Sequence, residues 1–283
     1  MVNDLARRRR AFSWRLLLSG SWLALVIFAA LFAPLVAPRD PLAQDLMLGR
    51  VPPFWMAGSE PGYLLGTDGL GRDVLSRLIY GSRIALIVAF VAAPGCCLIG
   101  SLLGLLAGYY RGVVDQVVSR IVDIWMSFPP VLFCILLVAV LGTGLHSVII
   151  AIVLIDWIRF ARVVRAETFN QSRMDYVDSA RVAGFSRTTI LVKEVLPNVL
   201  PAIAVLLTLQ MAIAVIVEAI LSFVSLSIST DDPTWGGMIA EGRTIIHSAW
   251  WVLVFPLIAL FLTVLALGQF GEGLKDRFDP VLQ

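Results

Sequence analysis

The chain has 283 residues, of which 59% are hydrophobic and only 15% are charged, with a formal net charge of +2. Its mean hydropathy is +0.88. Soluble domains carry about 25% charged residues, so this composition excludes a soluble enzyme, a disordered chain and a nucleic-acid-binding protein, and indicates an integral membrane protein.

The first apolar run, residues 16–38, carries no charge and follows Arg7 to Arg10 and Arg15. A helix needs about 20 apolar residues to cross about 30 Å of hydrocarbon. The basic start resembles a signal peptide, but the run is longer than a usual signal core and no Ala-x-Ala triplet follows it. We therefore predict a retained anchor helix.

Five further membrane spans are predicted from the remaining apolar runs. A second helix covers 84–110, and the run 124–155 is divided by Gly142-Thr143-Gly144 into a third helix ending near Leu141 and a fourth starting near Ser147. The fifth covers about 199–223 and the sixth about 250–270. The predicted fold class is all-α, a polytopic membrane protein with six transmembrane helices.

Arginine and lysine placement predicts the orientation, because cytoplasmic segments carry an excess of both. The excess falls on the segments that share a side with the N-terminus, so both termini are expected in the cytoplasm. The expected organisation is a cytoplasmic segment (1–15), an anchor helix (16–38), a periplasmic loop (39–83), a permease core (84–272) with a cytoplasmic loop at 165–198, and a cytoplasmic tail (273–283).

Two irregularities fall within the predicted spans. Pro129 and Pro130 interrupt the third helix, where freed carbonyls need other partners. Gly100, Gly104 and Gly108 repeat every four residues along one face of the second helix. Such a stripe lets another helix approach closely, so we interpret it as packing within the bundle, with a mobile contact beside the pathway as the alternative.

The cytoplasmic loop 165–198 predicts a helix–turn–helix pair. Its first half is expected to be helical to about Ala183, and Gly184 suits a left-handed C′ position because it has no Cβ. Ser186 is a candidate N-cap for a second short helix, and Pro197 a natural break after it.

This pair is expected to expose Ala180, Val182, Phe185 and Ile190 among charged residues. An exposed apolar surface of this kind fits a protein partner. The alternative is a surface helix that lies in the lipid headgroups.

Asp178-Ser-Ala-x-x-x-Gly184, followed by Val195-Leu-Pro-Asn198, resembles the EAA loop of bacterial ABC-importer permeases. This copy has Asp178-Ser179-Ala180 where the family has Glu-Ala-Ala. Aspartate keeps the charge and serine is nearly as small as alanine, so the docking shape is expected to survive.

Further motifs resemble the C-type permease subunit of the peptide and nickel importers, in the same order along the chain. They are 65–83 (LGTDGLGRDVLSRLIYGSR), 157–165, 218–223, 233–243 and 276–280. The segment 225–230 departs from that group, in which it is rich in glycine, and Asp156 and Arg159 are also departures.

Taken alone, the motif 65–83 predicts a tight turn at Gly66, Gly69 and Gly71 with local pairing of its charged side chains. A structural role for this motif is favoured over substrate contact. Those charged residues are Asp68, Arg72, Asp73, Arg77 and Arg83.

The resemblance implies a type I ABC-importer permease fold in the bacterial inner membrane. It implies a homologous second permease as heterodimer partner, two ATPase subunits that bind ATP and Mg²⁺, a periplasmic or lipid-anchored solute-binding protein, and surrounding lipid. It implies import of di- or oligopeptides by ATP-driven alternating access, with no cofactor, metal or catalytic residue in this chain and no nucleic acid as partner. The ATPase-coupling residues it implies are Tyr176, Asp178, Ser179, Ala180, Gly184, Phe185, Leu196 and Pro197.

Ionisable groups inside spans are candidates for function because burying them is costly. Glu218 either lines the translocation path or pairs with a neighbouring side chain. Met211 and Pro129 are further candidates for residues that line the path. Asp156 and Arg159 lie three residues apart and are expected to pair structurally.

Other functions remain as alternatives. Nickel or another small solute is the alternative cargo, although His146 and His247 have no second histidine at ligand spacing and the cysteines Cys96, Cys97 and Cys134 form no metal motif. An intramembrane enzyme would need a nucleophile with a base, paired carboxylates or a metal set, and the sequence has no such motif. A secondary transporter or ion channel is expected to contain internal inverted repeats. A channel would also have no need for the helix pair predicted in the loop 165–198.

Overall fold

The computed structural model describes residues 14–227 and 232–278, with side chains as far as 274. Arg7 to Arg10 of the predicted cytoplasmic segment lie outside this range. The chain divides into two compact units, one formed by residues 1–86 with 230–283 and the other by 87–229. Within the described ranges every regular element is a helix, apart from an isolated bridge between Thr67 and Asp73.

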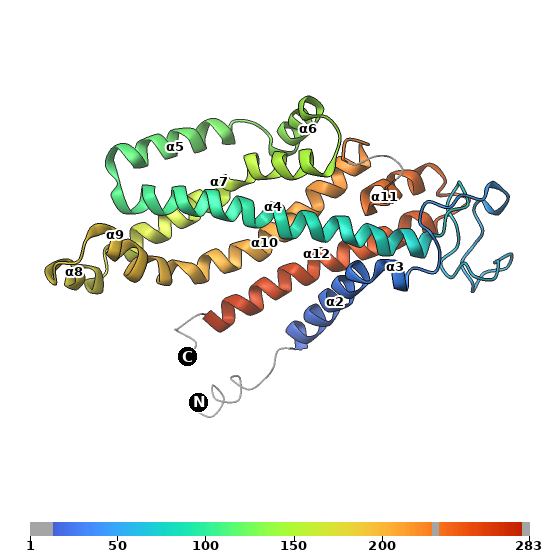
Figure 1. Cartoon of the computed structure of the whole chain (residues 1–283), viewed down its shortest axis with the longest axis horizontal. Helices are drawn as coiled ribbons and strands as arrows, with labels where there is room; N and C mark the ends of the chain where they lie inside the picture. Colours follow the sequence, from blue (N-terminus) through green and yellow to red (C-terminus); the bar gives the residue numbers. More distant parts are fainter. Residues whose placement is uncertain (1–13, 228–231, 279–283) are drawn as a thin grey trace. The chain divides into compact units, whose positions relative to one another are not determined.

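The first unit is built around the first and last helices of the chain. Its elements are α2 (Trp14–Leu31), α3 (Ala33–Val36), a 3₁₀ turn (Leu46–Leu48), the start of α4 (Val74–Tyr110), α11 (Trp235–Thr244) and α12 (Trp251–Phe278). α2 and α11 both pack against α12, and Figure 1 shows α2 in blue beside α12 in red. The helix predicted at 16–38 is divided at Phe32, because Pro34 lies in the first turn of α3 and the helix restarts there.

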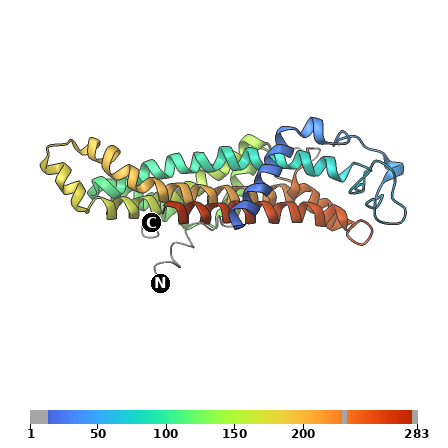
Figure 2. The ribbon, with the colours of Figure 1, turned by 90° about the horizontal axis from the view of Figure 1, so that it is seen from below.

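The second unit contains the rest of α4 and the helices that follow it. They are α5 (Gly112–Met126), α6 (Pro130–Leu141), α7 (Leu145–Gln171), α8 (Asp175–Val182), α9 (Arg187–Ile190), a π-helical segment (Leu191–Val195) and α10 (Leu196–Phe223). α7 packs against α5, α6 and α10. The short helices α8 and α9 lie where α7 ends and α10 begins, as Figure 2 also shows.

Four helical stretches in the described chain are long and apolar enough to cross a membrane singly. They are α2, α4, the stretch 187–223 and α12 as far as Leu274, and the bent pair α5 and α6 makes a fifth if it counts as one span. The predicted fourth span is present as the first part of α7. It is not counted among the long apolar helices because three charged residues, Asp156, Arg159 and Arg162, lie within the first 18 residues of α7.

The predicted third helix, 124–141, is not continuous. α5 ends at Met126, α6 begins at Pro130, and the two axes differ by 85°. Proline at the start of α6 has no N–H to donate into a preceding helix, so the chain changes direction at that point. The interruption at Pro129 and Pro130 was predicted, but the size of the bend was not.

Glycines in the second half of α4 lie against α7. A Cβ on Gly104 would lie 2.7 Å from the carbonyl oxygen of Ala161, and one on Gly108 would lie 2.5 Å from that of Arg165. Gly100 meets the carbonyl of Trp157 in the same way. The stripe is therefore a close helix–helix contact, which confirms its interpretation as packing.

Candidate functional site

The turn between α8 and α9 has the geometry that its sequence predicts. Gly184 has a φ of +82°, its N–H donates to the carbonyl of Arg181 at 3.0 Å, and the N–H of Phe185 donates to that of Ala180 at 3.1 Å. These two bonds form a Schellman motif. The hydroxyl of Ser186 then accepts from the N–H of Thr189 at 3.2 Å and caps α9.

Two local predictions for this segment are wrong. The first helix is not continuous to Ala183, because α7 ends at Gln171 and α8 starts at Asp175. Pro197 does not break the chain either; it lies in the first turn of α10, where its missing N–H costs no helical hydrogen bond. The π-helical segment 191–195 that joins α9 to α10 had no sequence indication.

The apolar residues of the loop divide between core and surface. Ala180 (8% exposed) and Ile190 (1%) are buried in the core of the second unit with Val177, which contradicts their predicted exposure. Ala180 is buried because α8 is amphipathic and turns the face that carries Val177 and Ala180 onto the core, and Ile190, the last residue of α9, packs into the same core. Val182 and Phe185 are exposed as predicted, at 90% and 54%.

The remaining predicted coupling residues differ in their exposure. Asp178 and Ser179 are exposed, and Asp178 forms a surface ion pair with Arg181 at 2.8 Å. Pro197 is exposed and Leu196 half-buried. The half-buried Tyr176 donates its hydroxyl to Gln171 at 2.9 Å, and burial raises the pKa of its phenol above the ordinary value.

The end of α7 that leads into α8 is held by contacts that the sequence did not indicate. The guanidinium groups of Arg111 and Arg173 each lie 4.0 Å from the ring centroid of Phe169. Arg165 of α7 forms a two-point ion pair with Asp115 of α5, with Nη2 at 2.9 Å from Oδ2. Cation–π and paired guanidinium contacts of this kind fix the position of the last turns of α7.

Glu218 of α10 is 2% exposed inside the second unit. Its Oε1 accepts hydrogen bonds from the hydroxyls of Ser222, at 2.5 Å, and Ser227, at 3.4 Å. Among the described residues it has no basic partner. Met211, two helical turns earlier on α10, is also buried, whereas Pro129 is exposed at the start of α6.

A polar contact also joins α7 to α10 inside the second unit. Asp156 is 5% exposed, accepts from Nε2 of Gln210 at 2.8 Å, and lies 3.7 Å from Nε of Arg159. The predicted pairing of Asp156 with Arg159 is thus present, and Gln210 is an additional partner that sequence spacing could not reveal.

Residues of the motif 65–83 form a buried ion cluster with Glu241 in the first unit. Asp68 accepts from Nε of Arg72 at 2.7 Å and also pairs with Arg77. Glu241 of α11 lies 2.9 Å from Nη2 of Arg72 and 2.6 Å from Nη1 of Arg77. Asp68 and both arginines are at most 4% exposed, which supports the structural interpretation of the motif.

Not every member of the motif joins this cluster. Asp73 accepts from the N–H and the hydroxyl of Ser76 at the start of α4, and Arg83 donates to the carbonyl of Ala30 at 3.0 Å. Gly66 and Gly71 have φ of +80° and +76°, where a Cβ would meet other backbone; Gly69 has no positive φ. The tight turn therefore depends on two of the three glycines.

Comparison with known proteins identifies relatives over most of the chain. A di/tripeptide transport system permease protein of Pseudomonas aeruginosa is 39% identical over 262 residues, covering 93% of this chain and 86% of the relative. A dipeptide transport system permease protein of Haemophilus influenzae is 35% identical, covering 93% and 89%. A glutathione transport system permease protein of Pectobacterium atrosepticum is 38% identical, covering 80% and 75%.

The fold is similar to that of a chain from the MetNI methionine ABC transporter, solved in inward facing conformations. The TM-score is 0.57 at 21% identity, over 70% of this chain and 96% of that chain. The model of the family described as binding-protein-dependent transport system inner membrane component matches residues 100–282. This chain therefore belongs to that family, as a multi-pass inner-membrane permease subunit of a binding-protein-dependent transport system.

Proposed function

We propose that the chain is one of two homologous permease subunits of an ABC importer for di- and oligopeptides. The two ATPases, which bind ATP and Mg²⁺, and the solute-binding protein are separate subunits, and this chain performs no covalent chemistry. Both termini face the cytoplasm. Relatives named as dipeptide, di/tripeptide and glutathione permeases support a peptide cargo.

The observation that carries the coupling role is that α8 and the turn after it have one apolar side that is buried and one that is exposed. Val177 and Ala180 hold α8 to the core, while Val182 and Phe185 present apolar surface to solvent. A large exposed apolar side chain at the end of a rigid turn fits a cleft on a protein partner. The ATPase is that partner, and the closure of the ATPase pair moves α8 and the helices on either side of it.

Val182→Asp tests this proposal. The residue is 90% exposed, so folding is expected to be unaffected, whereas an unpaired carboxylate buried at a docked interface costs several kcal/mol. Substrate-stimulated ATP hydrolysis by the reconstituted complex should fall at least about tenfold, which corresponds to about 1.4 kcal/mol. Val182→Thr, of similar shape and without charge, is the matched control and should remain coupled. Normal coupling in Val182→Asp would refute the docking role.

The cargo needs a separate measurement. Proteoliposomes that contain the complex, supplied with its binding protein, should accumulate labelled di- and tripeptides when ATP is present inside. Accumulation of nickel without peptide uptake would refute the cargo while leaving the coupling role intact.

A further inference from the structure

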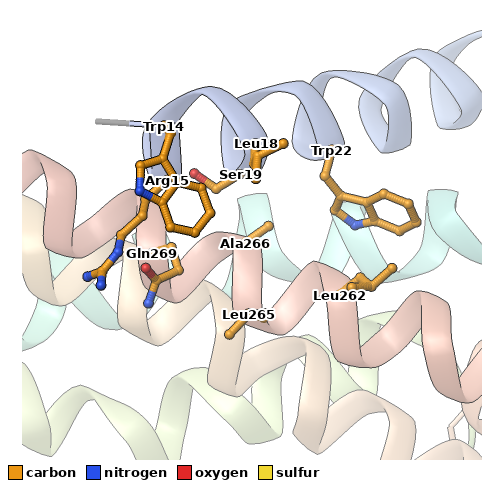
Figure 3. A pocket seen from close by; sticks show the side chains of 9 residues that line it. All are labelled: Trp14, Arg15, Leu18, Ser19, Trp22, Leu262, Leu265, Ala266 and Gln269. Atoms are coloured by element: carbon orange, nitrogen blue, oxygen red, sulfur yellow. The ribbon is translucent and has the colours of Figure 1, made fainter. Parts of the chain in front are cut away.

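A pocket of about 510 Å³ lies between α2 and α12 in the first unit. Figure 3 shows the side chains that line it, which come from two helices at opposite ends of the sequence. The volume falls within the range typical of small-molecule sites. None of the residues proposed for coupling or for the translocation path contributes to it.

The pocket is polar at one end and apolar at the other. Trp22 of α2 donates its indole N–H to Thr263 of α12 at 3.1 Å. Arg15, seven residues before Trp22, and Gln269, six residues after Thr263, line the same pocket, so α2 and α12 run antiparallel. Figure 3 shows Arg15 and Gln269 at one end, and Trp22 and Leu262 at the other. Seven residues of helix span about 10 Å, which is less than one leaflet of a hydrocarbon core about 30 Å thick.

Arg15 is the only charged residue of α2. It is exposed and has no ion-pair partner among the described residues. Glu272 of α12 accepts a hydrogen bond from Nε2 of Gln269 at 3.3 Å and forms no ion pair with Arg15. A guanidinium that pairs with no described acid, at the mouth of an apolar pocket, complements a phosphate group.

Two tryptophans define the ends of the pocket. Trp14 is 66% exposed beside Arg15, and tryptophan is enriched at the depth of lipid headgroups. The indole of Trp22 is held by its bond to Thr263 and forms a fixed wall at the apolar end. Leu18 and Ala266 line the pocket with apolar surface.

We propose that this pocket binds one anionic glycerophospholipid, with its phosphate at Arg15 and an acyl chain extending toward Trp22. Charge complementarity favours this occupant over the preceding segment of the chain, because Arg7 to Arg10 carry the same charge as Arg15. A lipid bound there contacts both the first and the last helix of the described chain, α2 and α12.

Native mass spectrometry of the complete purified complex tests the proposal. The complex is exchanged into nanodiscs with equal phosphatidylglycerol and phosphatidylcholine, then released into mild detergent. The wild type should retain phosphatidylglycerol preferentially. Arg15→Gln should lower that retention about fivefold, the effect of one basic residue near an anionic lipid surface. Arg15→Lys should preserve retention, and Ala266→Phe, which fills the pocket, should abolish it for both lipids.

Arg120→Gln is the matched control, since Arg120 is an exposed arginine of α5 outside the pocket and should leave lipid retention unchanged. Equal retention of both lipids by the wild type, or unchanged retention in Arg15→Gln, would overturn the proposal. A photocrosslinker at Leu18 identifies the occupant directly: a lipid adduct supports the proposal, and a crosslink only to another protein subunit refutes it.

Discussion

Asp68→Asn should strongly destabilise the first unit. Asp68 is 1% exposed and accepts from the backbone N–H groups of Leu70, at 2.8 Å, and Arg72, at 3.0 Å, besides pairing with the guanidinium groups of Arg72 and Arg77. Asparagine retains one carbonyl acceptor but directs an N–H₂ group toward buried cations. Removing one partner from a buried ion pair costs about 3–5 kcal/mol, because the other charge stays buried.

At about 2–4 °C per kcal/mol for a domain of 150–250 residues, this loss corresponds to a decrease of about 6–20 °C in the apparent unfolding temperature. The assay is thermal unfolding of the reconstituted complex followed by tryptophan fluorescence. Trp251 donates its indole N–H to Thr67 at 3.0 Å, so its emission reports on the cluster's surroundings. Glu241→Gln should have a smaller effect, because Glu241 is 34% exposed.

Glu60→Gln is the matched control for Asp68→Asn, since it removes one negative charge from an exposed position in the same segment before α4. Its effect should stay within about 0.5 kcal/mol. The decrease caused by Asp68→Asn should also be insensitive to salt, because buried pairs are screened much less than surface pairs. A decrease of less than about 2 °C, or one that disappears at high salt, would refute the burial argument.

Three further substitutions test the second unit. Gly104→Leu should prevent stable assembly, because even a Cβ would lie 2.7 Å from the carbonyl oxygen of Ala161; normal yield in size-exclusion chromatography would contradict the close helix contact. Ser225→Gly should raise stability by about 1 kcal/mol in thermal unfolding, because Ser225 has a φ of +59° that glycine adopts without steric cost. Glu218→Gln should change peptide uptake by less than about tenfold, since the new carbonyl still accepts from Ser222 and the change is worth about one hydrogen bond at most. Loss of uptake confined to cationic peptides would show instead that Glu218 contacts substrate.

Local backbone features could be predicted from the sequence because they depend on neighbouring residues alone. Gly184 adopts the left-handed conformation and Ser186 caps α9, as their residue types indicate. The resemblance of 178–184 to a family motif likewise identified the family that the comparison then showed. The segment 225–230 is one in which relatives were expected to be rich in glycine. Within it, Ser225 has the positive φ that glycine favours. Residues 228–230 lie outside the described residues.

Contacts between distant segments were not predictable in the same way. Ala180 and Ile190 look like surface residues among charges, and only the packing of α8 and α9 onto the core shows that both are buried. Glu241 lies 164 residues from Arg77, and nothing in the local pattern of either segment specifies their pairing. The 85° bend between α5 and α6 likewise depends on how each helix packs on α7, whereas the prolines specify only where it occurs.

The second unit contains the contacts that a coupling helix would need to move its neighbours. On one side, α8 follows α7 after three residues, and Phe169 at the end of α7 is held between Arg111 and Arg173. On the other side, α8 packs against the π-helical segment, in which Val195 is fully buried directly before α10. A displacement of α8 by itself would expose Val177 and the core around it. Moving the second unit as a whole preserves these buried contacts, so we expect a force on Val182 to shift α7 and α10 together rather than to bend the loop between them.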